Sequence, residues 1–337
     1  MFNNPHSNNT VEVPFYRRKG ERLVCEICPR FCTLSEGQTG ICRGRKNIGG
    51  KLIALNYGRS ASVAFDPMEK KPLYQFYPGT QILSVGANSC NFKCKFCQNY
   101  DISQYTVPTQ RIEAGELIEL SKRRGSIGIA YTYSEPLMWY EFLLDCCEQF
   151  KRAGMVNVLV TNGYINAEPL AKLLPLIDAM NIDLKSMEED FYWKMCGGVH
   201  LQPVLHTIET AYQAGVHIEL TQLIVTGAND KREQIGRTVD WISALGRDIP
   251  LHFSRYFPRF KYKAPATSPE TLKMAYKIAK QKLQWVYVGN ISLPEGNDSV
   301  CPGCGSMLVE RWGYSITVRN LEQNHCRMCG QEVYFKA

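Results

Sequence analysis

The chain has 337 residues, of which 45% are hydrophobic and 21% are charged, and its net charge is +7. These values are typical of a folded protein with a substantial core and exclude a collagen-like or largely disordered chain. No apolar run is long enough to span a membrane, and the polar start lacks a signal-peptide core, so we expect a cytoplasmic protein with no membrane partner. The mild positive charge leaves a nucleic-acid partner open. The 14 cysteines favour metal binding over disulfides in such a chain.

In chain order, the sequence divides into four parts. Residues 1–15 are expected to be disordered, and residues 16–76 form an N-terminal cysteine module. Residues 77–292 alternate short apolar strands with helical patterns, which predicts a parallel α/β sheet, and residues 293–337 form a tail. The predicted strands are Gln81–Gly86, Ile127–Thr132, Val156–Thr161, Ala179–Asp183, His217–Val225, Leu251–Tyr256 and Gln284–Val288. The predicted helices are Arg111–Arg124, Pro136–Ala153, Lys231–Leu245 and Leu272–Ile278, the last capped by Ser268.

The cysteines fall into three groups, and the central group directly follows the first predicted strand. Its spacing is Cys90-x3-Cys94-x2-Cys97. Three closely spaced thiolates suit an iron–sulfur cluster in which one iron has no protein ligand. Tetrahedral zinc would usually recruit a fourth cysteine or histidine, and none lies nearby in the sequence. The cysteines outside the three groups are expected to pack in the core: Cys146, Cys147 and Cys196.

The central segment CNFKCKFC, placed after the first strand of a βα series, resembles the cysteine signature of the radical S-adenosylmethionine (SAM) superfamily. This resemblance covers roughly residues 77–295. It implies a partial (β/α)6 barrel, which would lie between the N-terminal four-cysteine module and the tail. It also implies that Cys90, Cys94 and Cys97 hold a [4Fe-4S] cluster whose open iron binds SAM. An electron donor such as flavodoxin or ferredoxin would then reduce that cluster.

The ends of the later strands also resemble SAM-binding segments of the activating-enzyme branch of this superfamily. After the second strand, Tyr133 and Ser134 stand where the family has paired glycines, and the following Glu-Pro matches the family. Ligands of parallel α/β folds bind at the carboxyl ends of the strands, where these segments lie. The resemblance implies SAM contacts from six residues: Ser134, Glu135, Asn162, Asp183, Lys185 and His252.

Two further groups of four cysteines flank the α/β part. In the tail, two Cys-x2-Cys pairs with a following glycine predict a zinc ribbon, although a rubredoxin-like iron site uses the same ligands. At the N-terminus, the spacing leaves three alternatives open: a structural zinc ion, a second iron–sulfur cluster or no metal. The tail ligands are Cys301, Cys304, Cys326 and Cys329, and the N-terminal group is Cys25, Cys28, Cys32 and Cys42.

The combined features predict a radical SAM enzyme similar to pyruvate formate-lyase activating enzyme. Such an enzyme would cleave SAM reductively to a 5′-deoxyadenosyl radical and abstract hydrogen from an unknown substrate, which could be a protein. The segments CPRFC and YSEP and the tail ribbon also resemble the radical SAM protein of the AmmeMemoRadiSam system. The alternative hypothesis is a metal-knuckle adaptor or RNA-binding module without radical chemistry, because basic residues are scattered along the chain.

Overall fold

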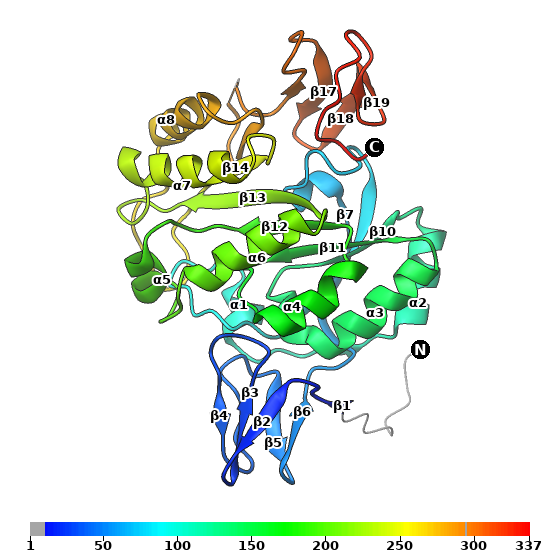
Figure 1. Ribbon diagram of the computed structural model, residues 1–337, viewed down its shortest axis with the longest axis vertical. Coiled ribbons are helices and arrows are strands. Elements are labelled where there is room, and N and C mark those ends of the chain that lie inside the picture. The colour runs from blue at the N-terminus through cyan, green and yellow to red at the C-terminus, as the bar shows by residue number, and fades with distance from the viewer. Residues whose placement is uncertain (1–10, 294) are drawn as a thin grey trace.

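The computed structural model describes residues 11–293 and 295–337, and Figure 1 shows three parts. A module of short strands (blue) and a small β-rich tail (red) lie at opposite ends of a central α/β body. Residues 1–10 of the expected disordered start lie outside the described residues. The expectation is wrong for residues 11–15, because Val11–Glu12 form a strand and Val13 and Phe15 are buried. Alternating apolar side chains on an extended segment can bury one face in this way.

The N-terminal module contains two small antiparallel sheets. Its cysteines lie at strand ends and in the connecting turns, so the backbone pairing brings them into one region. One sheet has the order β1-β6-β5 and the other β2-β3-β4. The strands are β1 (Val11–Glu12), β2 (Tyr16–Lys19), β3 (Arg22–Cys25), β4 (Thr33–Leu34), β5 (Arg45–Ile48) and β6 (Lys51–Ala54).

The central body is built on a nine-stranded sheet with the order β15-β14-β13-β12-β11-β10-β8-β7-β9. All pairings from β8 to β15 are parallel, as the alternation of strands and helices predicts. The order is that of an open sheet, since β15 and β9 stand at its two ends. The strands are β7 (Arg59–Pro67), β8 (Gln81–Ala87), β9 (Gln110–Arg111), β10 (Gly128–Tyr131), β11 (Val156–Thr161), β12 (Ala179–Asp183), β13 (His217–Ile224), β14 (Leu251–Arg255) and β15 (Val286–Gly289).

Strand β7 corrects the predicted boundary at residue 76. It pairs antiparallel with β8 along most of its length and therefore belongs to the central sheet. Its residues are small or half-buried and lack a strong apolar run, so the sequence pattern alone did not reveal a strand. The N-terminal module ends before Arg59.

Helices follow most of the parallel strands, and Figure 1 shows α2, α3, α4 and α6 along one face of the sheet. The Ser268 hydroxyl accepts a hydrogen bond from the Thr271 amide at 3.1 Å, which confirms the predicted cap. No helix of the described residues is both long and apolar enough to cross a bilayer. The helices are α1 (Tyr100–Gln104), α2 (Ala114–Arg123), α3 (Tyr140–Arg152), α4 (Ala167–Leu173), α5 (Glu189–Met195), α6 (Gln202–Gln213), α7 (Arg232–Leu245) and α8 (Pro269–Lys280), and the 3-10 turns are η1 (Met68–Lys70), η2 (Pro136–Trp139) and η3 (Leu174–Leu176).

The tail packs on the central body through a small apolar core of its own. Trp285 and Tyr287 of the body lie in this core with Leu308 and Phe335 of the tail. The Tyr334 hydroxyl also accepts a hydrogen bond from the Ile218 amide at 3.1 Å. The tail strands are β16 (Ser299–Val300), β17 (Met307–Trp312), β18 (Ser315–Val318), β19 (Leu321–Glu322) and β20 (His325–Cys326).

Candidate active site

A cavity of about 630 Å³ lies at the carboxyl ends of the parallel strands. Its wall contains residues from the ends of β10, β11, β12, β14 and β15 and from the cysteine loop after β8. This is the place where ligands bind in parallel α/β folds. The nine residues predicted to hold the central cluster and SAM all line this one cavity: Cys90, Cys94, Cys97, Ser134, Glu135, Asn162, Asp183, Lys185 and His252.

The three central cysteines lie in the loop between β8 and α1. Cys90 and Cys94 are buried, and Cys97 is half-buried with its Sγ 3.1 Å from the Ser103 hydroxyl. The neighbouring Cys196 thiol and burial raise the pKa of Cys94, and burial raises that of Cys90. Three thiols that are so close and largely withdrawn from solvent can remain ionised together only beside a cation, so the site fits a metal cluster. Cys196 is buried as expected, but its contact with Cys94 was not predicted.

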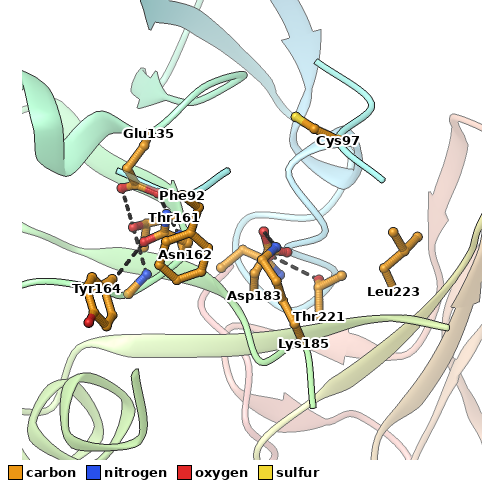
Figure 2. Close-up of polar contacts among 12 residues, drawn as sticks. Phe92, Cys97, Glu135, Thr161, Asn162, Tyr164, Asp183, Lys185, Thr221 and Leu223 are labelled. Atoms are coloured by element: carbon orange, nitrogen blue, oxygen red, sulfur yellow. Dashed lines mark hydrogen bonds and ion pairs between the residues drawn. The ribbon is translucent and has the colours of Figure 1, made fainter. Parts of the chain in front are cut away.

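Glu135 connects the ends of β10 and β11 on one side of the cavity, as Figure 2 shows. Its carboxylate accepts hydrogen bonds from the Thr161 hydroxyl at 2.6 Å, the Asn162 amide at 2.8 Å and the Leu137 amide at 3.1 Å. The last of these bonds caps η2. Burial raises the pKa of Glu135 to about 7. Both carboxylate oxygens are already engaged, so this side chain fixes the strand ends that shape the cavity.

The Asn162 side chain joins the cysteine loop to β11. It donates to the Asn91 side-chain oxygen at 2.9 Å and accepts from the Tyr164 amide at 2.9 Å. Asn91 in turn donates to the Tyr164 carbonyl at 2.9 Å. Asn91 follows Cys90 directly and was missed by the sequence analysis. Its position inside the cysteine motif is the signal that could have found it.

Tyr133 stands at a position where the family's SAM-binding segment has a glycine. Its φ of 68° lies in the left-handed region, which is unusual for a bulky residue. Its hydroxyl donates to the Asp66 carboxylate, and its carbonyl accepts from Asn99 at 2.7 Å. Ser134 is held in place by a hydrogen bond to the Ala87 carbonyl. The backbone thus adopts a conformation that glycine favours, and side-chain anchors hold the tyrosine in it.

Asp183 and Lys185 form an ion pair at the end of β12, with 2.8 Å between their side-chain oxygen and nitrogen. The pair and Glu135 line the same cavity, and Figure 2 shows them as separate groups of side chains. The Lys185 side chain is 12% exposed and that of Asp183 is 37% exposed. Burial alone would lower the pKa of Lys185, but the Asp183 carboxylate beside it keeps the pKa above its usual range. The pair therefore presents both charge signs to a ligand in the cavity.

His252 lies on β14 and is held by a buried carboxylate. Its Nε2 is 2.6 Å from Glu219 on β13, and its ring packs edge-on against Tyr74 at 4.8 Å between centroids. Glu219 also contacts His217 and accepts from the Tyr74 and Gln75 amides. Burial alone would raise the pKa of Glu219, but the hydrogen bonds from His217 and His252 lower it to about 2. The sequence analysis missed Glu219, which looks like an ordinary polar residue within an apolar strand.

Comparison of the chain with known proteins identifies its family. The model of the radical SAM superfamily matches residues 85–242. An uncharacterized protein of Methanocaldococcus jannaschii is 43% identical over 331 residues, which is 96% of this chain and 98% of the relative. The chain belongs to the radical SAM superfamily. Its cofactors are accordingly a [4Fe-4S] cluster and SAM, as the sequence predicts.

More distant relatives of this radical SAM protein include activating enzymes. The 4-hydroxyphenylacetate decarboxylase activating enzyme of Clostridium scatologenes is 25% identical over 44% of this chain and 52% of its own length. The pyruvate formate-lyase 1-activating enzyme of Escherichia coli is 22% identical over 57% of this chain and 80% of its own length. Among solved structures, SuiB of Streptococcus suis bound to SAM aligns with a TM-score of 0.49 and 13% identity, over 60% of this chain and 48% of that one. The finer resemblance to the AmmeMemoRadiSam system stays a prediction.

The tail of this radical SAM protein holds a second candidate metal centre. The Sγ atoms of Cys301, Cys304, Cys326 and Cys329 all lie within 4.8 Å of one another. Two of the distances are 3.6 Å, from Cys301 to Cys329, and 3.7 Å, from Cys304 to Cys326. A tetrahedral ion with metal–sulfur bonds of about 2.3 Å requires sulfur separations of about 3.8 Å. The prediction of a zinc-ribbon-like tail is confirmed, and zinc and rubredoxin-type iron fit this geometry equally.

Proposed function

We propose that this chain cleaves SAM reductively at a [4Fe-4S] cluster held by Cys90, Cys94 and Cys97 and then abstracts hydrogen from a substrate. The observation that carries the proposal is the shared cavity, because the three thiols and the six other predicted residues line one space. When bound, the cluster supplies the electron that splits SAM into methionine and a 5′-deoxyadenosyl radical. The alternative of a metal-knuckle adaptor or RNA-binding module is not favoured, because it gives this cavity no role.

The side chains around the cavity divide the binding of SAM between them. SAM carries an ammonium, a sulfonium and a carboxylate, and the Asp183–Lys185 pair offers one partner for each charge sign. Asp183 binds the cationic groups and Lys185 the carboxylate. His252 and the Tyr74 ring form an aromatic wall suited to adenine. Glu135 and Asn162 act as positioning residues, because their side-chain atoms already bind protein groups.

We further propose that the substrate is a protein and that the reaction is the formation of a glycyl radical. Two relatives with activating-enzyme names support this class. The cavity lies at the carboxyl ends of the strands, and part of its lining comes from the loops after them, where an extended peptide segment could enter. A one-electron donor protein such as flavodoxin or ferredoxin would supply the reducing equivalent.

The experiment that tests the SAM chemistry is anaerobic reconstitution with iron and sulfide, followed by measurement of 5′-deoxyadenosine after addition of SAM and dithionite. We expect product from the native chain and only background from the triple variant Cys90→Ala/Cys94→Ala/Cys97→Ala. The matched control is Cys146→Ala/Cys147→Ala, which removes two buried cysteines that do not line the cavity and should leave product formation intact. Product from the triple variant at the native level would refute the proposal.

A further inference from the structure

The four N-terminal cysteines surround one small cavity, although they come from different turns. Cys25 ends β3, Cys28 and Cys32 lie in the following turn, and Cys42 precedes β5. The Cys25 amide donates to the Cys32 carbonyl at 3.0 Å, which closes the turn around the cavity. The cavity measures about 10 Å³, and all four cysteines line it together with Arg45 and the apolar residues around them.

The size of this cavity indicates how far apart the sulfur atoms stand. A volume of this order admits one water-sized body. Four thiolates closing on a single ion at about 2.3 Å leave no such space between them. Within the described residues, the tail cysteines form the group whose ligand atoms all lie within 4.8 Å, and no three N-terminal cysteines meet that limit. The N-terminal sulfur atoms are therefore spaced more widely than those of the tail.

Arg45 supplies a second observation at the same cavity. Its side chain is buried, with Nη1 4.0 Å from the Cys42 Sγ and Nη2 3.0 Å from both carboxylate oxygens of Glu141. The Arg45 Nε is also buried, yet it has no hydrogen-bond partner among residues 11–293 and 295–337. A buried donor without a partner is costly, so it points to an acceptor that belongs at this site. Hydrogen bonds from nearby donors to sulfur are a regular feature of iron–sulfur clusters.

The N-terminal module is also fastened to the loop that carries the central cysteines. The Arg30 guanidinium donates to the Asn91 carbonyl at 3.0 Å and to the Gly197 carbonyl at 2.7 Å. The Arg43 guanidinium donates to the Ser103 carbonyl at 3.0 Å, and the Ser103 hydroxyl contacts the Cys97 Sγ. The N-terminal site therefore adjoins the central site and is separate from the tail.

From these observations we propose that Cys25, Cys28, Cys32 and Cys42 ligate a second [4Fe-4S] cluster. A cubane core bonds to thiolates that stand further apart than the ligands of a single ion, because its iron atoms lie outward from a common centre. Its sulfides offer acceptors to the Arg45 Nε. This site goes beyond the proposed SAM chemistry and rests on geometry that does not involve the large cavity.

The test uses the full chain with the triple substitution Cys90→Ser/Cys94→Ser/Cys97→Ser, reconstituted anaerobically with iron and sulfide. We expect this variant to retain about four iron ions and about four acid-labile sulfides per chain. Adding Cys25→Ser and Cys42→Ser should remove all labile sulfide and leave the tail ion in place. Absence of labile sulfide from the triple variant, with or without an extra zinc ion, would overturn the proposal.

A second measurement on the unmodified chain keeps the proposal testable if the triple variant does not fold. Two cubane clusters require about eight labile sulfides per chain, whereas one requires about four. Iron in the tail would not affect this count, because a rubredoxin-type site contains no sulfide. A value near four in a chain that cleaves SAM would overturn the second cluster and leave the proposed function standing. A value near eight labile sulfides in a chain that does not cleave SAM would support the second cluster and overturn the proposed function.

Discussion

The two four-cysteine groups lie at opposite ends of the molecule (Figure 1), and they differ in spacing rather than in the number of cysteines. In the tail, sulfur atoms approach within 3.6 and 3.7 Å, and Cys304 and Cys329 are exposed. At the N-terminus, the cysteines stand around a cavity and border a buried Arg45–Glu141 pair. A count of cysteines thus predicts a metal site, whereas the separation and surroundings of the sulfur atoms indicate how many metal ions it holds.

The largest effect should follow from removing ligands of the tail. Cys304→Ala/Cys329→Ala should release one ion and unfold the tail, because binding to structural sites of this kind contributes about 10–16 kcal/mol. Metal analysis and limited proteolysis would measure both effects. The control is Met328→Ala, an exposed residue between two ligands that should change neither. Retention of the metal by the double variant would contradict the assignment of these ligands.

The next effect concerns the charged pair beside the N-terminal site. Glu141→Ala leaves the Arg45 guanidinium buried without its carboxylate, which should lower the free energy of unfolding by about 3–5 kcal/mol. Glu148→Ala on the same helix removes an exposed partner of Arg152 and should cost no more than about 1 kcal/mol. Denaturant unfolding under anaerobic conditions would compare them. Equal losses would mean that the buried pair does not support the module.

A smaller loss of stability is expected from removing the hydrogen bonds between the N-terminal module and the loop of the central cysteines. Arg30→Ala removes three hydrogen bonds from a charged group to the Asn91, Gly197 and Gly198 carbonyls. The expected loss in unfolding free energy is about 1.5–3 kcal/mol, with slower SAM cleavage because the central loop loses a support. Arg17→Ala breaks a surface pair with Glu26 and is the matched control, with a loss of about 0.2–1 kcal/mol. If Arg30→Ala behaves like Arg17→Ala, the modules are not coupled in this way.

The parallel strands, the central trio and the tail ligands could be predicted from the sequence because their signals are local. Apolar runs mark the strands, and short cysteine spacings mark ligands that meet in one turn. Strand β7 was missed because its pairing with β8, rather than its own residues, makes it a strand. Glu219 was missed for a similar reason, since its partners His252 and Tyr74 come from distant parts of the chain.

The contacts of Glu135 and Asn162 also could not be predicted from the sequence. Their motifs predicted SAM contacts, and both residues line the large cavity at the strand ends. Sequence could not indicate that the Glu135 carboxylate binds the Asn162 backbone amide or that the Asn162 side chain binds the Asn91 side chain. The first contact depends on the register of β10 against β11, which forms only in the folded sheet.

Anomalous diffraction from crystals of the reconstituted chain, recorded at the iron and zinc absorption edges, tests the contrast between the two sites most directly. We expect the extended iron density of a cubane between Cys25 and Cys42, a second such density at Cys90, Cys94 and Cys97, and a single-ion peak at the tail cysteines. A single zinc peak among the N-terminal cysteines, of the same form as the tail peak, would contradict this expectation.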